Sequence, residues 1–486
     1  MNTLAVLLSD FYKQDHQRQY DPNITKIVSY YVPRKTRIDD FQQIVFFGLQ
    51  AFIKEYLIDY FNDHFFSLPL EKVLDEYRKV INKTMPGRCH EEKIIALHKL
   101  GYLPIAIKAL PEGVCVPIGV PLIEISNTHP DFAWCTNFIE TLMLSELWYT
   151  MCVATAARKY RLIANSYFLK TSDISPRNAI SEFGFRSLPG VNAAIKASNA
   201  FLLSFQKSSN IPAIQYAGDM YNTDYEEVGS GMASTEHSVM CSSALIDQDE
   251  TPSIKRLLTE VYPTGNFSMV CDSFDYWNVI TNILPSLKEE ILRRDGTLFV
   301  RGDSGNPVDI IVKTVECLWE IFGGTTNSKG YKVLDSHVRA IYGDSITQKR
   351  AQQIYHRLMD LGFSSENVAL GAGGFSMLAY EDEFGNMRMF TRDTFNVAIK
   401  CSYVEYNGEP VMVYKDPKTD TGMKKSHKGC CIVVGQLDRT FECLDNLVFE
   451  DTHCTENNLH YVFKDSELLK EVSLTDVRQN LWKGKF

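Results

Sequence analysis

The middle of the chain repeats a pattern in which a short apolar run ends in polar or glycine residues. Four such runs begin at Phe267, Leu298, Val338 and Asn367. Segments with helical periodicity follow two of them, at residues 307–322 and 347–361. Because alternating strands and helices favour a parallel sheet, the pattern predicts an α/β fold containing an irregular, TIM-like parallel barrel. The active site of such a barrel lies at the carboxyl ends of its strands.

The residues after these runs have the charges and small size expected around a bound phosphate. Arg301 and Asp303 follow Leu298–Val300 and, being two apart on a strand, share one face. An arginine suits phosphate or pyrophosphate, and a carboxylate suits sugar hydroxyls or a metal. A purely structural ion pair is the alternative. The other runs end in Asp272-Ser273, in Gly343-Asp344-Ser345 and in the glycines Gly371, Gly373 and Gly374.

The flanking regions have other patterns. Helical spacing covers residues 41–60, 70–81 and 133–169, whereas residues 103–125 read as short strands joined by Pro/Gly turns. Near the carboxyl end, two strands flank Asn407-Gly408, a strong hairpin signal. We therefore expect an N-terminal α+β region at 1–179, the barrel at 180–398 and a β-rich region at 399–486. The two end regions are expected to form one additional α+β domain.

Composition excludes some classes of function. The chain has 486 residues, 45% of them hydrophobic, and a formal net charge of −10, which argues against a general nucleic-acid binder. No apolar stretch approaches the roughly 18–20 residues that cross a bilayer, and the amino terminus lacks a signal-peptide pattern. These features predict a soluble protein without membrane contact. The 12 cysteines include no Cys-x-x-Cys pair, so spacing does not favour a zinc or iron–sulfur site. Free cysteines, including an adjacent Cys430-Cys431 pair interpreted as strand packing, fit a reducing cytoplasm.

Three further clusters are candidates for binding. Residues 415–429 form a basic loop, which is either a solvated turn or a pyrophosphate clamp. Phe183-Gly184-Phe185-Arg186 places aromatic rings beside an arginine, although aromatic residues are usually in the core. His237, within Glu236-His237-Ser238, is either a structural histidine or a group close to phosphate oxygens.

Taken in order, these segments resemble the nicotinamide phosphoribosyltransferase family of type II phosphoribosyltransferases over nearly the whole chain. The matching stretches include 10–13, 102–105, 136–141, 183–186, 236–238, 272–275, 303–307, 327–332, 343–344, 391–393, 400–404 and 415–417. The resemblance implies the type II phosphoribosyltransferase barrel. It also implies transfer of a phosphoribosyl group from 5-phosphoribosyl 1-pyrophosphate to nicotinamide, with Mg²⁺ present, in NAD salvage.

The resemblance also implies roles for individual residues. Pyrophosphate would be held by Arg186, His237, Arg301, Arg34, Lys400 and Lys424. Ribose and its phosphate would contact Asp303, Asp344, Gly343, Gly373, Gly374 and Arg392, with Asp272 in the same substrate-binding set. The pyridine ring would stack between Phe183 and Tyr12, the latter supplied by the other subunit of a homodimer. His237, Asp303, Asp344 and Arg301 form the expected catalytic group. Mg²⁺ would bind mainly through the pyrophosphate, and ATP would activate the enzyme by phosphorylating His237.

Three departures from the family pattern affect these expectations. Ser209 stands where the family has an aspartate that accepts a hydrogen bond from the nicotinamide amide, so selection against nicotinic acid is expected to weaken. Residues 375–390 form a longer segment than usual, read as an exposed hairpin or loop. Gly302 replaces a usual proline.

These departures leave several alternatives open. The acceptor could be nicotinic acid, or the donor an ADP-ribose pyrophosphate admitted by a pocket that residues 375–390 reshape. A non-catalytic nucleotide-binding protein is the alternative from another class. A structural scaffold is disfavoured, because strand ends rich in Gly, Asp and Arg lower stability without improving packing.

Overall fold

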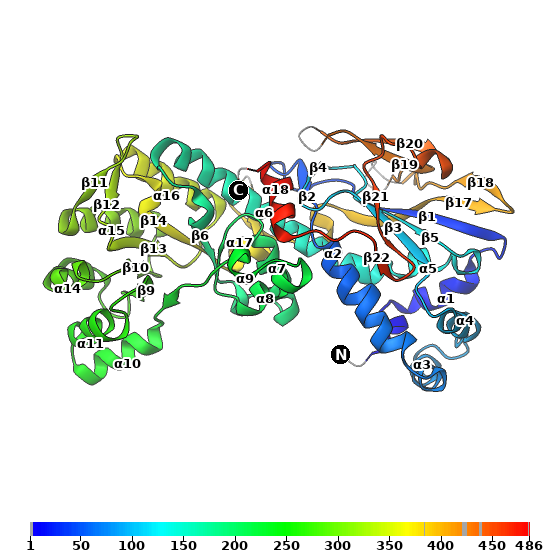
Figure 1. Ribbon diagram of the computed structural model, residues 1–486, viewed down its shortest axis with the longest axis horizontal. Helices are drawn as coiled ribbons and strands as arrows, with labels where there is room; N and C mark the ends of the chain where they lie inside the picture. The colour runs from blue at the N-terminus through cyan, green and yellow to red at the C-terminus, as the bar shows by residue number, and fades with distance from the viewer. Residues whose placement is uncertain (1–2, 383, 420–424, 437–439, 485) are drawn as a thin grey trace. The chain divides into compact units, whose positions relative to one another are not determined.

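The computed structural model describes residues 3–382, 384–419, 425–436, 440–484 and 486 (Figure 1). The chain folds into two compact units. The barrel unit contains Ala156–Gly218 and Thr223–Met389, and the terminal unit contains Met1–Thr155, Asp219–Asn222 and Phe390–Phe486. The borders near residues 155 and 390 differ from the expected ones at 179 and 398. The first border falls inside the long helix α6 (Glu140–Thr171), where the apolar pattern has no break.

A parallel sheet forms the centre of the barrel unit. Its strand order is β7-β6-β14-β13-β10-β9-β8, and every neighbouring pair is parallel. An isolated parallel bridge between Lys207 and Ser230 brings the two edges of the sheet together. The expected parallel α/β barrel is therefore confirmed. The strands are β6 (Ile180–Glu182), β7 (Lys207–Ser208), β8 (Ala233–Ser234), β9 (Phe267–Val270), β10 (Leu298–Gly302), β13 (Val338–Tyr342) and β14 (Val368–Ala372).

The central strands of the barrel are mostly apolar and largely buried. All four residues of β9 are buried, and β10 pairs in register with both β9 and β13. Leu298 lies opposite Phe267 on one side and Val338 on the other. This common register places the carboxyl ends of the strands, with their polar residues, at one end of the barrel.

Helices connect the barrel strands, as the periodicity predicts. Asn306 caps α15 and Thr347 caps α16, each by accepting backbone N–H bonds. The barrel-unit helices are α7 (Val191–Phe201), α9 (Tyr225–Val228), α10 (His237–Asp247), α11 (Glu250–Arg256), α12 (Tyr276–Asn278), α13 (Leu284–Ser286), α14 (Lys288–Leu292), α15 (Pro307–Phe322), α16 (Gln348–Asp360) and α17 (Gly374–Leu378). The helix α8 (Ile211–Met220) ends across a unit border.

The extra segment after the glycine cluster contains the short helix α17 and the antiparallel hairpin β15 (Ala379–Glu381) and β16 (Met387–Met389). The carboxylate of Asp382 accepts hydrogen bonds from Asn386 and Arg388, which holds the turn together. The prediction of an exposed hairpin is confirmed, with Phe384 80% exposed at its tip. A second small hairpin pairs β11 (Gly324–Thr326) with β12 (Lys332–Leu334).

Both ends of the chain contribute strands to one antiparallel sheet in the terminal unit, where blue and cyan strands lie beside orange and red ones in Figure 1. Its order is β18-β17-β1-β5-β3-β21-β22. Asn407 and Gly408, with φ of 52° and 82°, form the turn between β17 and β18 that the sequence indicates. The strands are β1 (Ile24–Pro33), β3 (Ile105–Ala109), β5 (Ile123–Asn127), β17 (Val397–Tyr406), β18 (Glu409–Met412), β21 (His460–Lys464) and β22 (Glu467–Leu468).

One helix prediction in this unit is wrong at its start. Residues 41–48 are not helical: β2 (Gln43–Val45) pairs with β4 (Cys115–Pro117), and helix begins only at Leu49. A strand partner 70 residues away overrides the local periodicity. The remaining elements are α1 (Phe11–Gln19), α2 (Leu49–Phe52) with its continuation to Phe66, α3 (Leu70–Thr84), α4 (Glu92–Leu100), α5 (Cys135–Phe138), α18 (Leu474–Trp482), β19 (Cys430–Val434) and β20 (Glu442–Leu447). Over the described ranges, no helix combines the length and apolarity needed to cross a membrane.

Candidate active site

An ion pair with two close contacts lies at the end of β10. Arg301 Nε donates to Asp303 Oδ1 at 3.0 Å, and Arg301 Nη2 lies 2.8 Å from Oδ2. Each side chain is 18% exposed, so the pair is largely shielded yet open to a ligand. This geometry fixes both planar groups in one orientation. The predicted shared face of the two residues is thus present.

Asp272 connects this pair to the neighbouring strand end. Its Oδ2 accepts the backbone N–H of Asp303 at 3.2 Å, and its Oδ1 lies 3.3 Å from His237 Nε2. The Asp272 side chain is 5% exposed, whereas that of His237, at the start of α10, is 49% exposed. A buried carboxylate therefore orients an accessible imidazole. The structure brings together His237, Asp272, Arg301 and Asp303 from the ends of three strands.

Gly343, directly after β13, lies very close to the ion pair. A Cβ at this position would lie 2.3 Å from Asp303 Oδ1 and 2.8 Å from Arg301 Nε. Real Cβ atoms do not approach other atoms this closely, so a larger residue here would force the Asp303 and Arg301 side chains to move. Gly343 thus closely approaches a side-chain pair, and its predicted contact with the ribose phosphate stays a prediction.

Three carboxylates create a negative potential near the end of β13. Burial, together with Asp303, Asp344 and Asp272, raises the pKa of Tyr342 to about 12. Asp344 itself is exposed, and its carboxylate accepts a hydrogen bond from Ser345 Oγ at 2.8 Å. The strand ends thus combine cationic groups for an anion with carboxylates suited to hydroxyls or a bound cation.

A cavity of about 610 Å³ lies in the barrel unit beside these groups. Phe183 and Arg301 both line it, with Arg301 Cζ 5.7 Å from the centre of the Phe183 ring. That ring lies over Gly371, where a Cβ would come within 1.8 Å of Phe183 Cζ. The full lining is Ser181, Phe183, Phe185, Arg186, Leu188, Gly190, Val191, Ser209, Met232, Ser234, Thr235, Ser268, Arg301 and Ile341.

Ser209 and Ser208 face different surroundings because they are adjacent in an extended segment. Ser209 is exposed and lines the cavity, and its N–H donates to the Glu182 carbonyl at 2.8 Å. Ser208 is buried and donates to the Glu182 carboxylate at 2.7 Å. Burial raises the pKa of Glu182, which also accepts the Gly184 N–H at 2.7 Å. Glu182 therefore braces the backbone on either side of the cavity rather than lining it.

Sequence reasoning missed four polar residues that line this cavity: Ser181, Ser234, Thr235 and Ser268. Ser268, on β9, is 1% exposed, and its Oγ has no hydrogen-bond partner among the described residues. Thr235 also lines the cavity, and its Oγ1 accepts the Val270 N–H at 2.9 Å. A buried hydroxyl without a partner is unusual, which indicates a group positioned for a ligand or water. For Ser268, the only signal in the sequence was that it is a single serine inside an otherwise apolar strand.

Two predicted phosphate contacts after β14 differ in their surroundings. A Cβ on Gly373 would meet nothing within 4 Å, whereas one on Gly374 would lie 3.0 Å from Ser187 Cβ. Arg186, on the next loop, is exposed and lines the cavity with Ser209. These positions are compatible with the predicted roles, which stay predictions.

The remaining predicted residues belong to the terminal unit. Arg34 and Lys400 line a cavity of about 290 Å³ in that unit, together with Lys425 and His427. Arg34 donates to the Asn396 carbonyl at 3.2 Å, and Lys400 Nζ lies 3.4 Å from Glu140 Oε1.

Two other residues of this unit lie on its surface, and a third cannot be placed. Tyr12, on α1, is 55% exposed. Its pKa is raised mainly by partial burial and, to a smaller extent, by the nearby carboxylates of Glu140 and Asp10. Arg392 pairs with Asp393 at 2.9 Å. Lys424 lies outside the described residues.

Comparison with known sequences identifies two matching families. The profile of the nicotinate phosphoribosyltransferase (NAPRTase) family matches residues 178–467, and that of the nicotinamide phosphoribosyltransferase N-terminal domain matches residues 4–85. A nicotinamide phosphoribosyltransferase of Acinetobacter baylyi is 37% identical over 97% of this chain and 96% of its own length. Another, of Xanthomonas campestris pv. campestris, is 31% identical over 97% of each chain.

Solved structures with the same fold are more distant in sequence. Human nicotinic acid phosphoribosyltransferase superposes with a TM-score of 0.59 at 15% identity, covering 98% of this chain and 93% of that one. The nicotinate-nucleotide pyrophosphorylase of Pyrococcus furiosus gives 0.58 at 14% identity, covering 99% and 94%. These similarities support the predicted type II phosphoribosyltransferase fold.

Proposed function

The chain belongs to the nicotinamide phosphoribosyltransferase family, and from this premise we propose that it joins nicotinamide to 5-phosphoribosyl 1-pyrophosphate. The products are nicotinamide mononucleotide and pyrophosphate, a step of NAD salvage. The enzyme is a pentosyltransferase. The observation that carries the proposal is the linked group Arg301, Asp303, Asp272 and His237, with Arg301 also facing Phe183 in the cavity.

The cationic groups act on the leaving pyrophosphate. Displacement at the anomeric carbon of ribose places growing negative charge on the pyrophosphate and positive charge on the sugar. Arg301, Arg186 and His237 are the barrel-unit groups that stabilise that negative charge. Because Asp303 holds Arg301 in one orientation, the guanidinium does not reorganise as the charge develops.

The carboxylates bind the ribose and the cation that accompanies pyrophosphate. Asp303 and Asp344 orient the ribose hydroxyls, and Asp272 keeps His237 and the Asp303 backbone in place. Mg²⁺ typically binds through one or two carboxylates plus substrate phosphates. The exposed Asp344 and the largely shielded Asp303 fit that pattern, and Mg²⁺ bound there would neutralise charge on the departing pyrophosphate.

Phe183 provides one face of the site for the pyridine ring. Its ring is held over Gly371 inside the cavity, and we assign the opposite face to Tyr12 of a second subunit in a homodimer. The exposure of Tyr12 is compatible with that role. Arg34, Arg392, Lys400 and Lys424 complete the phosphate-binding cluster in this proposal, and Gly373 and Gly374 lie by the ribose phosphate. Free cysteines throughout the described chain are compatible with a cytoplasmic enzyme.

His237 is also the group that ATP would phosphorylate. Its Nε2 contacts Asp272, and its side chain is accessible. A phosphorylated His237 beside Arg301 and Asp272 would couple ATP hydrolysis to product formation. ATP is therefore an optional activating co-substrate in the proposal.

Nicotinic acid is a second candidate acceptor, favoured by one observation. The described residues that line the cavity include Arg186 and Arg301 but no carboxylate, and Ser209 stands where the family has an aspartate. A negatively charged acceptor would therefore meet no like charge on the cavity wall. Rejecting an analogue strongly requires a polar group left unpaired or a repelling charge.

The test is product identification by mass spectrometry. Purified protein with Mg²⁺ receives nicotinamide or nicotinic acid, each paired with 5-phosphoribosyl 1-pyrophosphate or ADP-ribose pyrophosphate. Nicotinamide mononucleotide as the dominant product supports the proposal. Nicotinic acid mononucleotide as the dominant product would make nicotinic acid the acceptor. NAD made in one step would make ADP-ribose pyrophosphate the donor and implicate the β15–β16 hairpin in admitting it. Binding without product from any pair would instead make the chain a nucleotide-binding protein.

A further inference from the structure

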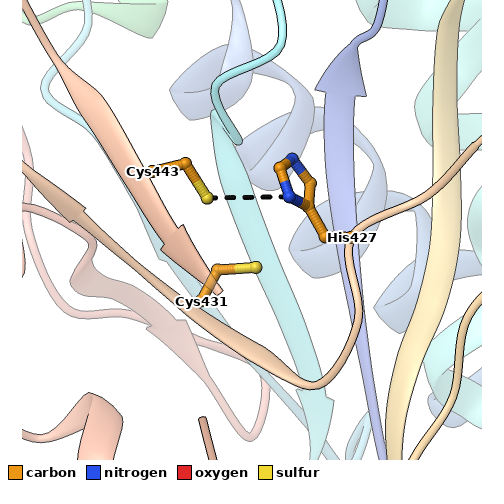
Figure 2. Close-up of side chains that lie close together, drawn as sticks. All are labelled: His427, Cys431 and Cys443. Carbon is orange, nitrogen blue, oxygen red and sulfur yellow. Dashed lines mark hydrogen bonds between the residues drawn. The ribbon is translucent and has the colours of Figure 1, made fainter. Parts of the chain in front are cut away.

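The terminal unit contains a histidine and two cysteines that the proposed reaction does not use. His427, Cys431 and Cys443 each offer one ligand atom, and these three atoms lie within 4.8 Å of one another. Cys431 is buried, and the other two residues are partly buried. Figure 2 shows the two sulfur atoms and the imidazole pointing toward one common point. Cys443 comes from β20, so the sequence spacing of cysteines alone did not reveal the cluster.

The separations suit a tetrahedral zinc ion. Zinc binds sulfur at about 2.3 Å and histidine nitrogen at about 2.0–2.1 Å, which places such ligands about 3.6 Å apart for N and S. The His427 Nδ1 to Cys443 Sγ distance is 3.8 Å. Only a small contraction is therefore needed for these two ligands.

The histidine already has the orientation of a metal ligand. Its Nε2 lies 2.9 Å from the Gly119 carbonyl, which can only accept a hydrogen bond, so Nε2 carries a proton. In the neutral ring the lone pair is then on Nδ1, the atom that faces Cys443. Histidines that bind metals usually donate their second N–H in this way.

An acidic side chain also lies beside the cluster. Asp445 Oδ2 is 3.3 Å from His427 Nδ1, the same nitrogen that faces Cys443 Sγ. A neutral ring whose Nε2 donates to Gly119 has only a lone pair at Nδ1, so a cation bound between these groups would satisfy the lone pairs that face one another.

We propose that His427 Nδ1, Cys431 Sγ and Cys443 Sγ bind a structural zinc ion in the terminal unit, with Asp445 beside the fourth coordination position. Thiolate and imidazole ligands select a soft or borderline divalent ion over Mg²⁺ or Ca²⁺. Binding releases protons from the ligands and breaks no covalent bond.

The ion would connect the loop before β19 to strand β20. His427 and Lys425, on that loop, line the same 290 Å³ cavity as Arg34 and Lys400. The Cys431 backbone is also fixed, since its N–H donates to Tyr30 Oη at 2.9 Å. Zinc would thus keep the basic lining of this cavity in one arrangement.

The experiment measures metal on the full chain, purified without chelator from zinc-supplemented cells. Elemental analysis should find about one zinc per chain. Exchange into cobalt should give thiolate-to-metal charge-transfer absorption, a readout that requires no variant. Cys443→Ser should lose most of the zinc and that absorption. Cys430→Ser is the matched control, because Cys430 lies on the same strand as Cys431 and is not one of the three clustered ligands. The control should keep both signals.

Three results would overturn the proposal. The first is wild-type protein that holds no zinc and gives no cobalt charge-transfer absorption. The second is equal zinc content in wild type and Cys443→Ser. The third is a Cys431–Cys443 disulfide found by mass spectrometry in protein prepared without oxygen. None of these readouts depends on the proposed phosphoribosyl transfer, so the two proposals fail separately.

Discussion

The barrel unit and the terminal unit build their polar sites in different ways. In the barrel unit, the key side chains lie at or shortly after the carboxyl end of a strand, and the parallel register brings Asp272, Arg301 and Asp303 to one edge. In the terminal unit, antiparallel strands from both chain ends combine residues that are hundreds of positions apart, such as Arg34 and Lys400. A barrel site is thus readable from local sequence, whereas a site in the mixed sheet requires the long-range pairing to be known.

The largest predicted effect tests whether one active site combines Tyr12 of one subunit with Asp303 of the other subunit. Tyr12→Ala and Asp303→Ala should each be inactive alone. Mixed after dissociation and reassociation, they should regain about a quarter of wild-type activity, because half of randomly formed dimers contain one intact site. Activity is measured as nicotinamide mononucleotide formed per subunit. No recovery, with heterodimers shown by mass, would place Tyr12 in its own subunit's site, whereas activity of Tyr12→Ala alone would place it outside any site.

The next prediction concerns the fit between strand ends. Gly343→Ala should lower kcat/KM for the phosphoribosyl donor by about 100-fold, because its Cβ would displace Asp303 and Arg301. Gly371→Ala should instead mainly raise KM for the pyridine acceptor, since its Cβ would strike the Phe183 ring. Steady-state kinetics with each substrate varied separates the two. Identical defects in both variants would contradict separate donor and acceptor regions.

Acceptor choice gives a smaller effect. Ser209→Asp should raise the ratio of kcat/KM for nicotinamide over nicotinic acid by about tenfold or more, because a carboxylate accepts an amide N–H and repels a carboxylate. Ser209→Asn, which adds an amide without charge, is the matched control and should move the ratio less. An unchanged ratio in Ser209→Asp would show that position 209 does not set selectivity.

The smallest predicted effect concerns Glu182, the buried carboxylate that accepts hydrogen bonds from Ser208 and Gly184. Burial raises the folded-state pKa of Glu182 above the ordinary value of 4.5, so the folded chain binds more protons than the unfolded chain. Its contribution to stability is therefore present below about pH 4.5 and is lost as the pH rises through the raised pKa. Glu182→Gln should remove this part of the pH dependence, a change of a few degrees in Tm. If the Tm of Glu182→Gln changed with pH in the same way as the Tm of wild type, Glu182 would not be a source of this pH dependence.

Particular residues show which features of the structure could be predicted from the sequence. The helix at residues 307–322 and the Arg301–Asp303 contact were predictable, because capping, periodicity and strand alternation act over a few residues. The predicted helix at 41–60 begins only at residue 49, because residues 43–45 form strand β2, whose partner β4 lies far away in the sequence.

The sequence also did not reveal side-chain environments that form only through tertiary packing, because the contacting residues are far apart in the chain. Ser268 looks like an ordinary strand residue until the barrel closes around it. The cluster of His427, Cys431 and Cys443 appears only once β19 pairs with β20.

The most direct test of the central account is the stoichiometry of products formed by wild type and Asp303→Ala from nicotinamide and 5-phosphoribosyl 1-pyrophosphate. The exposed Asp309→Ala serves as a control on the following helix. Wild type and the control should release nicotinamide mononucleotide and pyrophosphate in equal amounts, and Asp303→Ala should be slower by about 1,000-fold while remaining folded. Comparable rates in Asp303→Ala, or pyrophosphate released without the mononucleotide, would contradict transfer at the strand ends of the barrel.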